Sequence, residues 1–324
     1  MIRCRFVNVV FLLSIGWGAT SCRQSDGLET ELSQISFHSN VDGKEWQAYP
    51  FYESRHDDVT SKSRGALVST NTMYRSFGCW ASTYGIAEIW SESSPINLMV
   101  NREINSESSY TSTTYWPGAQ RKVKFFAYAP YGSTAISLRN NSTGYPAFDY
   151  TVPLQVAEQQ DVLVAATGEY DGNYNNAVAL NFKHALTAVR FIDKGLPQGT
   201  LTKITLSGVY GKAQHYVGKD VWDTHSDVKD FALPLNYIPS STPGLGIEVN
   251  GGDNHFLMIP QTLPEGAGLK IEIQDQTGVT QEYTTSLAGA VWLMGKIVKY
   301  NLSMNAGALI VVGELGDWQD GGDL

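Results

Sequence analysis

The sequence predicts an all-β protein, and three observations indicate this class. Short apolar or alternating runs recur along the chain with turn residues between them, a spacing typical of β-sandwiches. Only 17% of the residues are charged, while Tyr, Thr, Ser, Gly and Asn are plentiful, as in extracellular β-structure. No stretch shows an amphipathic helical period beyond about two turns, and no internal repeat is evident.

The first element in chain order is a secretory signal peptide at residues 1–21. Arg3 and Arg5 form a basic segment, an apolar run too short to span a bilayer follows, and small residues lead up to Cys22. This order is typical of a bacterial lipobox, in which Cys22 becomes the lipidated first residue, although Ala19 stands where Leu is usual. The alternative is an ordinary cleaved signal with an unmodified thiol at Cys22. Both interpretations predict export from the cytoplasm.

The next elements are a polar leader over 23–34 and a first short strand. Ile35 and Phe37 alternate with polar residues, which is the period of a half-buried strand. Residues 40–63 are predicted to form a loop because few positions in them are periodic. The turn-rich stretch 167–176 is predicted to separate two domains. Strands are predicted at 77–84, 123–128, 162–165, 178–182, 186–191, 201–210, 246–249, 256–259, 269–273 and 296–302.

Charge and cysteine content limit the function further. The formal net charge is −9, and removing Arg3 and Arg5 with the signal makes it −11. Binding to nucleic acid depends on neutralising phosphates, so this charge argues against a nucleic-acid partner. Of the three cysteines, one lies in the signal and Cys22 is the predicted lipid site, so Cys79 has no intramolecular disulfide partner. We expect Cys79 to be a small buried apolar side chain.

Motifs for catalysis, cofactors and metals do not occur in the sequence. Zinc-protease, nucleophile-elbow, phosphate-loop and dinucleotide patterns are all missing, which predicts a protein that is not an enzyme and binds no cofactor. The stretch 171–182 begins like a calcium loop but lacks its glycine and its final glutamate. Residues 223–227 with His215 fit no standard metal site and are predicted to form a solvated loop. His184 is expected to be a hydrogen-bonded structural histidine.

Five phrases, in order, resemble the fimbrillin family, the pilins and pilus-associated lipoproteins of Gram-negative anaerobes. They are YWP (115–117) followed by VKFFAYAP (123–130), DVLVA (161–165), LNFKHALTAVRF (180–191), MIPQ (258–261) and WLMGKIVKY (292–300). The resemblance implies two tandem transthyretin-like Greek-key β-sandwich domains. It divides the chain into a lipidated leader with first strand and loop at 22–76, an N-terminal sandwich at 77–168 completed by the strand near 35–37, and a C-terminal sandwich at 177–324.

The resemblance also implies a mode of assembly. Family members are exported as lipoproteins, an arginine-specific protease removes their N-terminal strand, and a neighbouring subunit fills the exposed groove with a strand, often its C-terminal one. Partners would then be other pilus subunits, and the outer membrane through the lipid anchor. Arg64 is the first candidate for the cleavage site, followed by Arg55 and Arg75.

A donor strand is available near the end of the chain, within residues 305–324. Leu309, Ile310, Val311 and Val312 form an apolar, largely β-branched run without Pro, and Trp318 could anchor it in a groove. The alternative interpretation is that this run is the last strand of its own domain, with Trp318 capping the sandwich.

A second class of function is a surface lipoprotein that binds glycan without polymerising. Its stacking platforms would be Trp90, Tyr110, Tyr115 or Tyr145, although packing inside the sandwich is the commoner role of such aromatics. A host glycan or protein is a further possible partner under either function. The predicted location is the cell surface.

Overall fold

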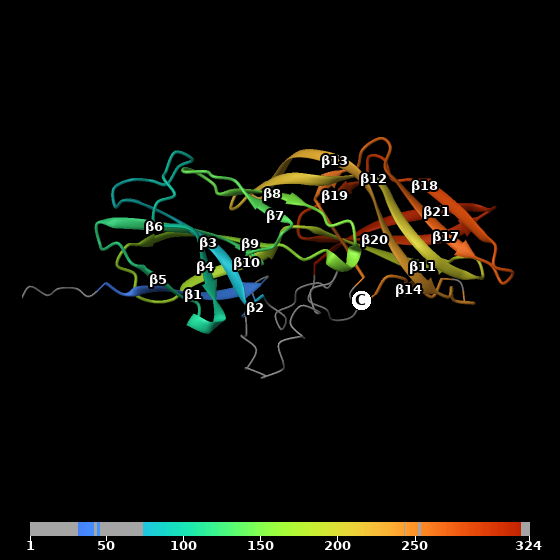
Figure 1. Cartoon of the computed structure of the whole chain (residues 1–324), viewed down its shortest axis with the longest axis horizontal. Coiled ribbons are helices and arrows are strands. Elements are labelled where there is room, and N and C mark those ends of the chain that lie inside the picture. Colours follow the sequence, from blue (N-terminus) through green and yellow to red (C-terminus); the bar gives the residue numbers. More distant parts are fainter. Residues whose placement is uncertain (1–31, 42–43, 46–73, 243, 252–253, 319–324) are drawn as a thin grey trace, which may run out of the picture. The chain divides into compact units, whose positions relative to one another are not determined.

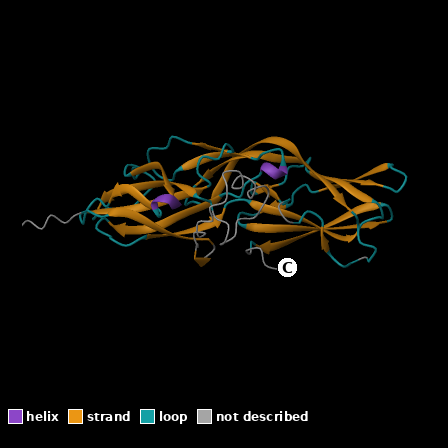
Figure 2. Ribbon diagram, turned by 60° about the horizontal axis from the view of Figure 1, so that its bottom comes forward, coloured by secondary structure: helices purple, strands orange, loops and turns teal. Residues whose placement is uncertain are grey.

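The computed structural model describes residues 32–41, 44–45, 74–242, 244–251 and 254–318. Strands and two short 3-10 helices, Ser106–Ser108 (η1) and Val156–Glu158 (η2), make up the regular structure of these ranges (Figures 1 and 2). None of the helices found in these ranges has the length and apolar character needed to cross a membrane. The all-β class predicted from the sequence is therefore confirmed.

The first half of the chain builds an eight-stranded sheet in the order β2-β1-β10-β9-β6-β3-β4, with β5 also paired to β1. Its strands are β1 (Gln34–Val41), β2 (Lys44–Glu45), β3 (Ser76–Gly85), β4 (Met99–Asn105), β5 (Thr111–Tyr115), β6 (Arg121–Ala129), β9 (Leu163–Asp171) and β10 (Val178–His184). The pairing of β1 with β10 is parallel, whereas β10 and β9 are antiparallel.

This sheet is curled on itself. In a flat sheet, β1 and β3 would lie about 19 Å apart, because three strands separate them in the hydrogen-bonding order. The rings of Phe37 on β1 and Phe77 on β3 nevertheless meet edge to face with centroids 5.7 Å apart. Curling therefore places the inward side chains of distant strands in one cluster, which we call the first core.

The second sheet has six strands, with β12 at its centre: one edge of β12 pairs with β13 along nearly its whole length, and different stretches of β12 also pair with β17 and β8. The strands are β7 (Ile136–Leu138), β8 (Ala147–Thr151), β12 (Thr200–Tyr216), β13 (Val221–Tyr237), β17 (Gly268–Gln274) and β18 (Thr280–Ser286). Residues 200–207 of β12 pair with β17, and residues 212–216 of the same strand pair with β8. One long strand thus joins segments from both halves of the chain.

The third sheet has the order β14-β11-β20-β21, with β15 also paired to β11. Its strands are β11 (Thr187–Gly195), β14 (Ile247–Glu248), β15 (Phe256–Met258), β20 (Lys296–Asn305) and β21 (Ala308–Asp317), and a separate pair consists of β16 (Gln261–Thr262) and β19 (Val291–Trp292). β11 and β20 are parallel, and β20 and β21 form an antiparallel hairpin.

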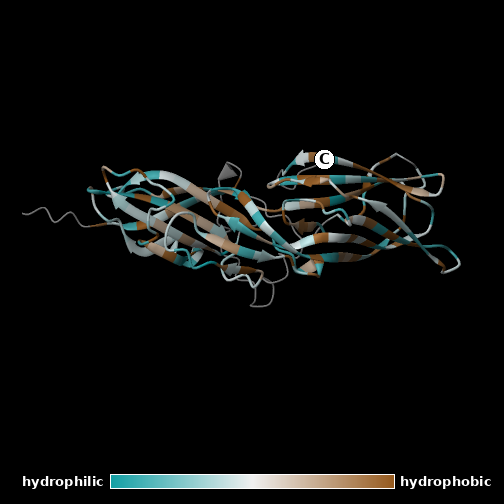
Figure 3. Ribbon diagram, turned by 90° about the horizontal axis from the view of Figure 1, so that it is seen from above, coloured by the Kyte–Doolittle hydropathy of each residue, from teal (hydrophilic) through white to brown (hydrophobic). Residues whose placement is uncertain are grey.

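Two clusters of buried apolar side chains hold these sheets together. The first core lies inside the curled sheet and contains Phe37, Phe77, Phe125 and Phe182 among others. Successive residues of a strand point to opposite faces, so Phe126, next to Phe125, belongs to a different cluster. This second core extends under the second and third sheets. Figure 3 shows the hydrophobic and hydrophilic residues that alternate along many of the strands.

All the predicted strands occur. In the middle of the chain, however, the strands pair in a way that does not follow the predicted domain ranges. β9 continues to Asp171, inside the stretch 167–176 expected to be a turn-rich boundary. β10, at the start of the range 177–324, pairs with β1 and β9 rather than with later strands. The phrase 180–191 is therefore divided between two sheets.

The loop predicted at residues 223–227 is wrong, because these residues lie within β13. Most of β13 between Val221 and Asp230 is exposed or half-buried, so no apolar alternation marks it as a strand. Its pairing with β12 shifts register several times, and Thr224 and Asp227 have positive φ values of 54° and 61°. The extended pairing with β12, rather than a local hydrophobic pattern, therefore determines that these residues form a strand.

Candidate functional site

The first strand, β1, fills a groove in the first core. Ile35, Phe37, Ser39 and Val41 point inward and are at most 5% exposed, while the residues between them are exposed or half-buried. Phe37 meets Phe77 and Phe125 edge to face, with ring centroids 5.7 and 5.5 Å apart. The groove that β1 fills is therefore apolar and lined by aromatic rings.

The backbone of β1 is bonded along both of its edges. On one side Phe37–Val41 pair with Val178–Phe182 of β10 in a parallel register. On the other side β1 pairs with β5, Phe37 N donates to Tyr110 O at 3.1 Å, and Trp116 N donates to Ser33 O at 3.0 Å. Taking β1 away would leave donors and acceptors of β10 and β5 unpaired at the rim of an apolar slot.

The predicted processing sites lie mostly outside the described residues. This holds for the signal 1–21, for Cys22, and for Arg55 and Arg64 between β2 and β3. Arg75 is described: its side chain is exposed, and its carbonyl oxygen accepts a hydrogen bond from Ser106 N at 3.0 Å. A protease binds the segment that it cleaves in an extended conformation. The hydrogen bond from Ser106 N to Arg75 O would have to break first, so it disfavours cleavage at Arg75.

The tail strand β21 contrasts with β1 in how little of it is buried. It pairs along its whole length with β20, from Asn305↔Ala308 to Lys296↔Asp317. Leu309 is 5% exposed, whereas Ile310, Val312 and Leu315 are 40%, 55% and 53% exposed. In the free chain β21 is thus a strand of its own sheet, as one of the two sequence interpretations expected.

Trp318, directly after β21, is buried against the end of β10. Its ring stacks on the imidazole of His184 with centroids 4.1 Å apart and planes 13° from parallel, and it is 6% exposed. His184 Nδ1 lies 2.7 Å from Asp161 Oδ2, and both side chains are at most 1% exposed. Tyr74, the first described residue before β3, donates its hydroxyl to Asp161 O at 2.6 Å. We call Asp161 and His184 the Trp318 socket.

Sequence reasoning expected a hydrogen-bonded His184, which is confirmed, but it missed the pairing with Asp161 and the stacking of Trp318. Asp161 directly precedes the apolar run 162–166, and His184 directly precedes Ala185-Leu186, so each is expected to be near a core, where a polar residue needs a partner. That signal marks each of them as paired. It does not identify the partner, because the contact joins residues 23 positions apart, and Trp318 comes from the far end of the chain.

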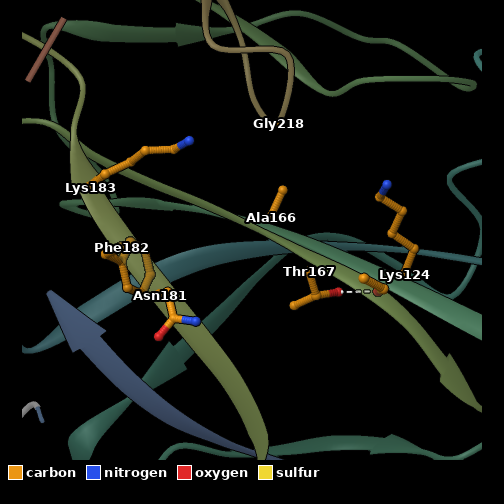
Figure 4. A pocket seen from close by; sticks show the side chains of 8 residues that line it. Lys124, Ala166, Thr167, Asn181, Phe182, Lys183 and Gly218 are labelled. Atoms are coloured by element: carbon orange, nitrogen blue, oxygen red, sulfur yellow. Dashed lines mark hydrogen bonds between the residues drawn. The ribbon is translucent and has the colours of Figure 1, made fainter. Parts of the chain in front are cut away.

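A pocket of about 530 Å³ opens on the face of β9 and β10 away from the first core (Figure 4). Lys124 and Lys183 stand on opposite sides of it, with Ala166 and Thr167 between them and Gly218 of the β12–β13 turn above. Lys183 is paired with Asp220. Burial lowers the pKa of Lys124, whose ammonium lies 4.3 Å from the centroid of the Trp90 ring.

The aromatics considered as glycan platforms are engaged in packing, with one exception. Trp90 carries Lys124 over its ring and touches Phe126 and Tyr145, with centroid distances of 5.7 and 4.8 Å. Tyr110 stacks on Phe77 of the first core. Tyr115 is the exception, at 51% exposure on β5. Stacking on a sugar needs a free ring face, so the described aromatics give the glycan hypothesis little support.

Other sequence candidates are structural. His215 is fully buried between Phe148 and Trp222, with ring centroids 5.3 and 4.7 Å away, and burial lowers its pKa to about 4. No group of three or more metal-binding side chains occurs in the part of the chain that the structure describes. Cys79 is buried in the first core, as expected, and burial raises the pKa of its thiol.

Comparison with known proteins decides the family. A profile of the fimbrillin-like family matches residues 79–318, from β3 to Trp318. The chain belongs to the fimbrillin-like family. The sequence-based resemblance is therefore confirmed, and the match ends at the tryptophan that caps the tail.

The fimbrillin-like relatives are fimbrial and adhesion proteins. Fimbrium subunit Fim1C of Phocaeicola vulgatus is 25% identical over 213 residues, which cover 52% of this chain and 56% of that protein. A crystal structure of a fimbrial protein from Bacteroides vulgatus has a TM-score of 0.56 at 19% identity, covering 75% of this chain and 93% of that one. A Bacteroides ovatus protein described as a cell adhesion protein also has a TM-score of 0.56, at 14% identity, covering 89% and 98%. These structures share the fold, and none of these three relatives is named as an enzyme.

Proposed function

We propose that the protein is a structural or adhesive subunit of a cell-surface fimbria, assembled by donor-strand exchange. In this proposal it is exported as a lipoprotein through Cys22 and held at the outer membrane. Proteolysis at Arg64 or Arg55 then separates β1 from the body, and a strand from another subunit takes its place. The observation that carries the proposal is the position of β1: it supplies four inward side chains to the first core but is connected to β3 through the segment that holds both arginines.

We also propose that the chain forms two transthyretin-like domains. The first would contain residues 77–168 together with the rest of β9, β10 and β1, and the second would begin near β11 rather than at residue 177. The supporting observations are the pairing of β10 with β1 and β9, and the curled sheet around the first core. The shared strand β12 would connect the two domains.

The tail strand matches β1 in the side chains that a groove would receive. Inward positions of β1 carry Ile35, Phe37, Ser39 and Val41, an order of large, large, small and large. One face of β21 carries Leu309, Val311, Gly313 and Leu315, which repeats that order at the same spacing of two residues. The opposite face of β21 would place the carboxylate of Glu314 in the groove, where an unpaired charge is strongly disfavoured.

Neighbouring valines on β21 provide a matched test of this assembly. After digestion with an arginine-specific protease, the wild-type chain is expected to form detergent-resistant ladders on gels run without heating. Val311→Asp should abolish the ladders because it buries a carboxylate in the groove, while Val312→Asp should retain them. Identical behaviour of the two variants would contradict donation of this face. N-terminal sequencing of the digested chain identifies the cleaved arginine, and Arg64→Ala and Arg55→Ala serve as controls.

A further inference from the structure

The pocket shown in Figure 4 borders the groove that β1 fills. Asn40, on the outward face of β1, is opposite Asn181 of β10, and its Nδ2 donates to Asn181 Oδ1 at 3.0 Å. Asn181 and Lys183 stand on the same face of β10 and line the pocket. Among the described residues that line it, the charged ones are Lys124 and Lys183. An anion on the outward face of a strand in the groove would therefore meet positive charge at this point.

The tail strand carries an anion at the matching position. In the register proposed for the donated tail, Glu314 takes the place of Asn40 and points out of the groove. It is the only charged residue in the stretch 308–316. Its side chain would stand opposite Asn181 of the acceptor and diagonal to Lys183. Diagonal neighbours on adjacent strands are about 7–8 Å apart, a distance that two long side chains can span.

In its own sheet, Glu314 already has the same two kinds of partner. Asn301 Nδ2 donates to Glu314 Oε1 at 2.8 Å, and Lys299 is opposite Glu314 in the pairing of β20 with β21. Transfer of the tail would exchange Asn301 and Lys299 for Asn181 and Lys183, an amide and an ammonium in both places. The carboxylate would keep a hydrogen-bond donor and an opposite charge, so transfer would leave it without an unpaired charge.

We propose that this pocket is the recognition site for the Glu314 carboxylate of a second copy of this chain. Asn181 donates a hydrogen bond to the carboxylate, and Lys183 supplies the opposite charge. Lys183 is also paired with Asp220, but an ammonium has three donors and can serve both carboxylates. This inference rests on the proposed donor-strand exchange and adds to it the contact that fixes the register of the donated strand.

The register needs such a contact because apolar alternation alone leaves it open. A shift of the donated strand by two residues keeps the same face pointing into the groove. It would, however, bring Val312 or Gly316 opposite Asn181, and neither carries a charge. The register with Glu314 opposite Asn181 is therefore distinguished from its neighbours by the pairing with Lys183.

The test measures the coupling between the two charges in a heterodimer that forms in one direction only. The donor is the uncut full chain, so its groove is filled by β1. The acceptor is the protease-treated chain with Val311→Asp, so it cannot donate its own tail. Dissociation constants are measured for the four combinations of donor with and without Glu314→Lys and acceptor with and without Lys183→Glu. Effects of each substitution within its own chain cancel in this double-mutant cycle.

The expected result is a rescue by opposite charge. Lys183→Glu in the acceptor should weaken binding of the wild-type donor about 5-fold, as for a partly exposed ion pair, and should not weaken binding of the Glu314→Lys donor. A Val312→Lys donor is the matched control and should behave like the wild type. Equal weakening with all three donors would overturn the inference while leaving strand donation intact. Failure of the wild-type donor to bind the acceptor would contradict the proposed function itself.

Disulfide mapping checks the register without relying on charge. Cys79 is buried and is kept, whereas the other native cysteines are replaced by Ser in both chains. Donor Glu314→Cys should form a disulfide with acceptor Asn181→Cys under mild oxidation, because opposite residues on neighbouring strands are close enough for one. Acceptor Ala179→Cys is the control and should stay unlinked. A disulfide with Ala179→Cys alone would place the tail in another register and overturn the inference.

Discussion

The first and last strands of the described chain, β1 and β21, are held in different ways. β1 has four buried side chains, aromatic contacts on Phe37 and backbone partners along both edges. β21 pairs with β20 on one edge, exposes most of its apolar side chains and is fixed chiefly by Leu309 and Trp318. The strand proposed to be removed is thus the firmly packed one, and the strand proposed to move is the lightly held one.

This difference agrees with a proteolytic step in the proposed assembly. Spontaneous loss of β1 would expose an apolar slot and unpaired backbone groups, so the uncut chain keeps its groove closed. The tail can leave its own sheet while disturbing few buried contacts. In the proposed assembly, β1 would therefore control when the groove opens, and β21 would be the strand that is transferred.

The largest expected effect is that of Phe37→Ala, which tests whether β1 is held by its buried side chains. Removing a buried aromatic ring from the first core should lower the free energy of unfolding of the uncut chain by about 3–5 kcal/mol. Urea denaturation followed by fluorescence measures this change. Gln34→Ala, on the exposed side of the same strand, is the control and should change stability by less than about 0.5 kcal/mol. Equal effects would mean that β1 is not held by its inward face.

Acidification should lower the stability of the chain as a whole, because His215 is buried against Phe148 of the second core. Its pKa is about 4 in the folded chain against an ordinary value near 6.5, so the unfolded chain binds the proton first as pH falls. Stability is unaffected above pH 6.5, declines between pH 6.5 and 4, and loses about 3 kcal/mol in total. Urea titrations at pH 7.5, 5.5 and 4.5 test this. His215→Phe should remove this part of the decline, and an unchanged slope would show that other groups cause it.

In β21, the more lightly held of the two strands, Trp318→Ala should increase local opening without unfolding the rest of the chain. We expect a loss of about 2 kcal/mol, seen as about 30-fold faster amide exchange along β21. Hydrogen–deuterium exchange with mass spectrometry measures this directly. Exchange in β1 should not change. If β1 loosened as well, the two strands would not be independent. Leu315→Ala, at an exposed site, is the matched control.

The smallest effect is expected for Val312→Thr. This side chain is 55% exposed and points away from the face proposed to enter the groove, so stability should change by less than about 0.5 kcal/mol. Thermal unfolding of the uncut chain provides the measurement. A larger loss would show that the outer face of β21 is covered in solution.

The sequence predicted strands well where apolar periodicity is strong, and poorly where long-range pairing decides. The alternation at Ile35 and Phe37 correctly identified β1, because its inward face enters a core. β13 was missed because its exposed polar residues carry no such pattern, and β12 provides its register. The stretch 167–176 was predicted from its turn residues, but β9 continues into it as far as Asp171, because Asp171-Gly172 comes at the end of that strand.

The candidate site was predictable in parts. The composition of the tail 308–312 marked it as a strand, but composition cannot tell whether a strand pairs with its own sheet or with another chain. The Trp318 socket required the fold, since Asp161, His184 and Trp318 come from three separate segments. Local patterns identify the elements, and tertiary contacts decide which of them meet.

The division of β12 between two sets of partners has a mechanical consequence. Residues 200–207 are bonded to β17, and residues 212–216 are bonded to β8, without a linker between them. In the proposed fibre, tension along β12 would be carried by one continuous backbone and by the hydrogen bonds that flank it on both stretches. We therefore expect the subunit to resist stretching as one unit.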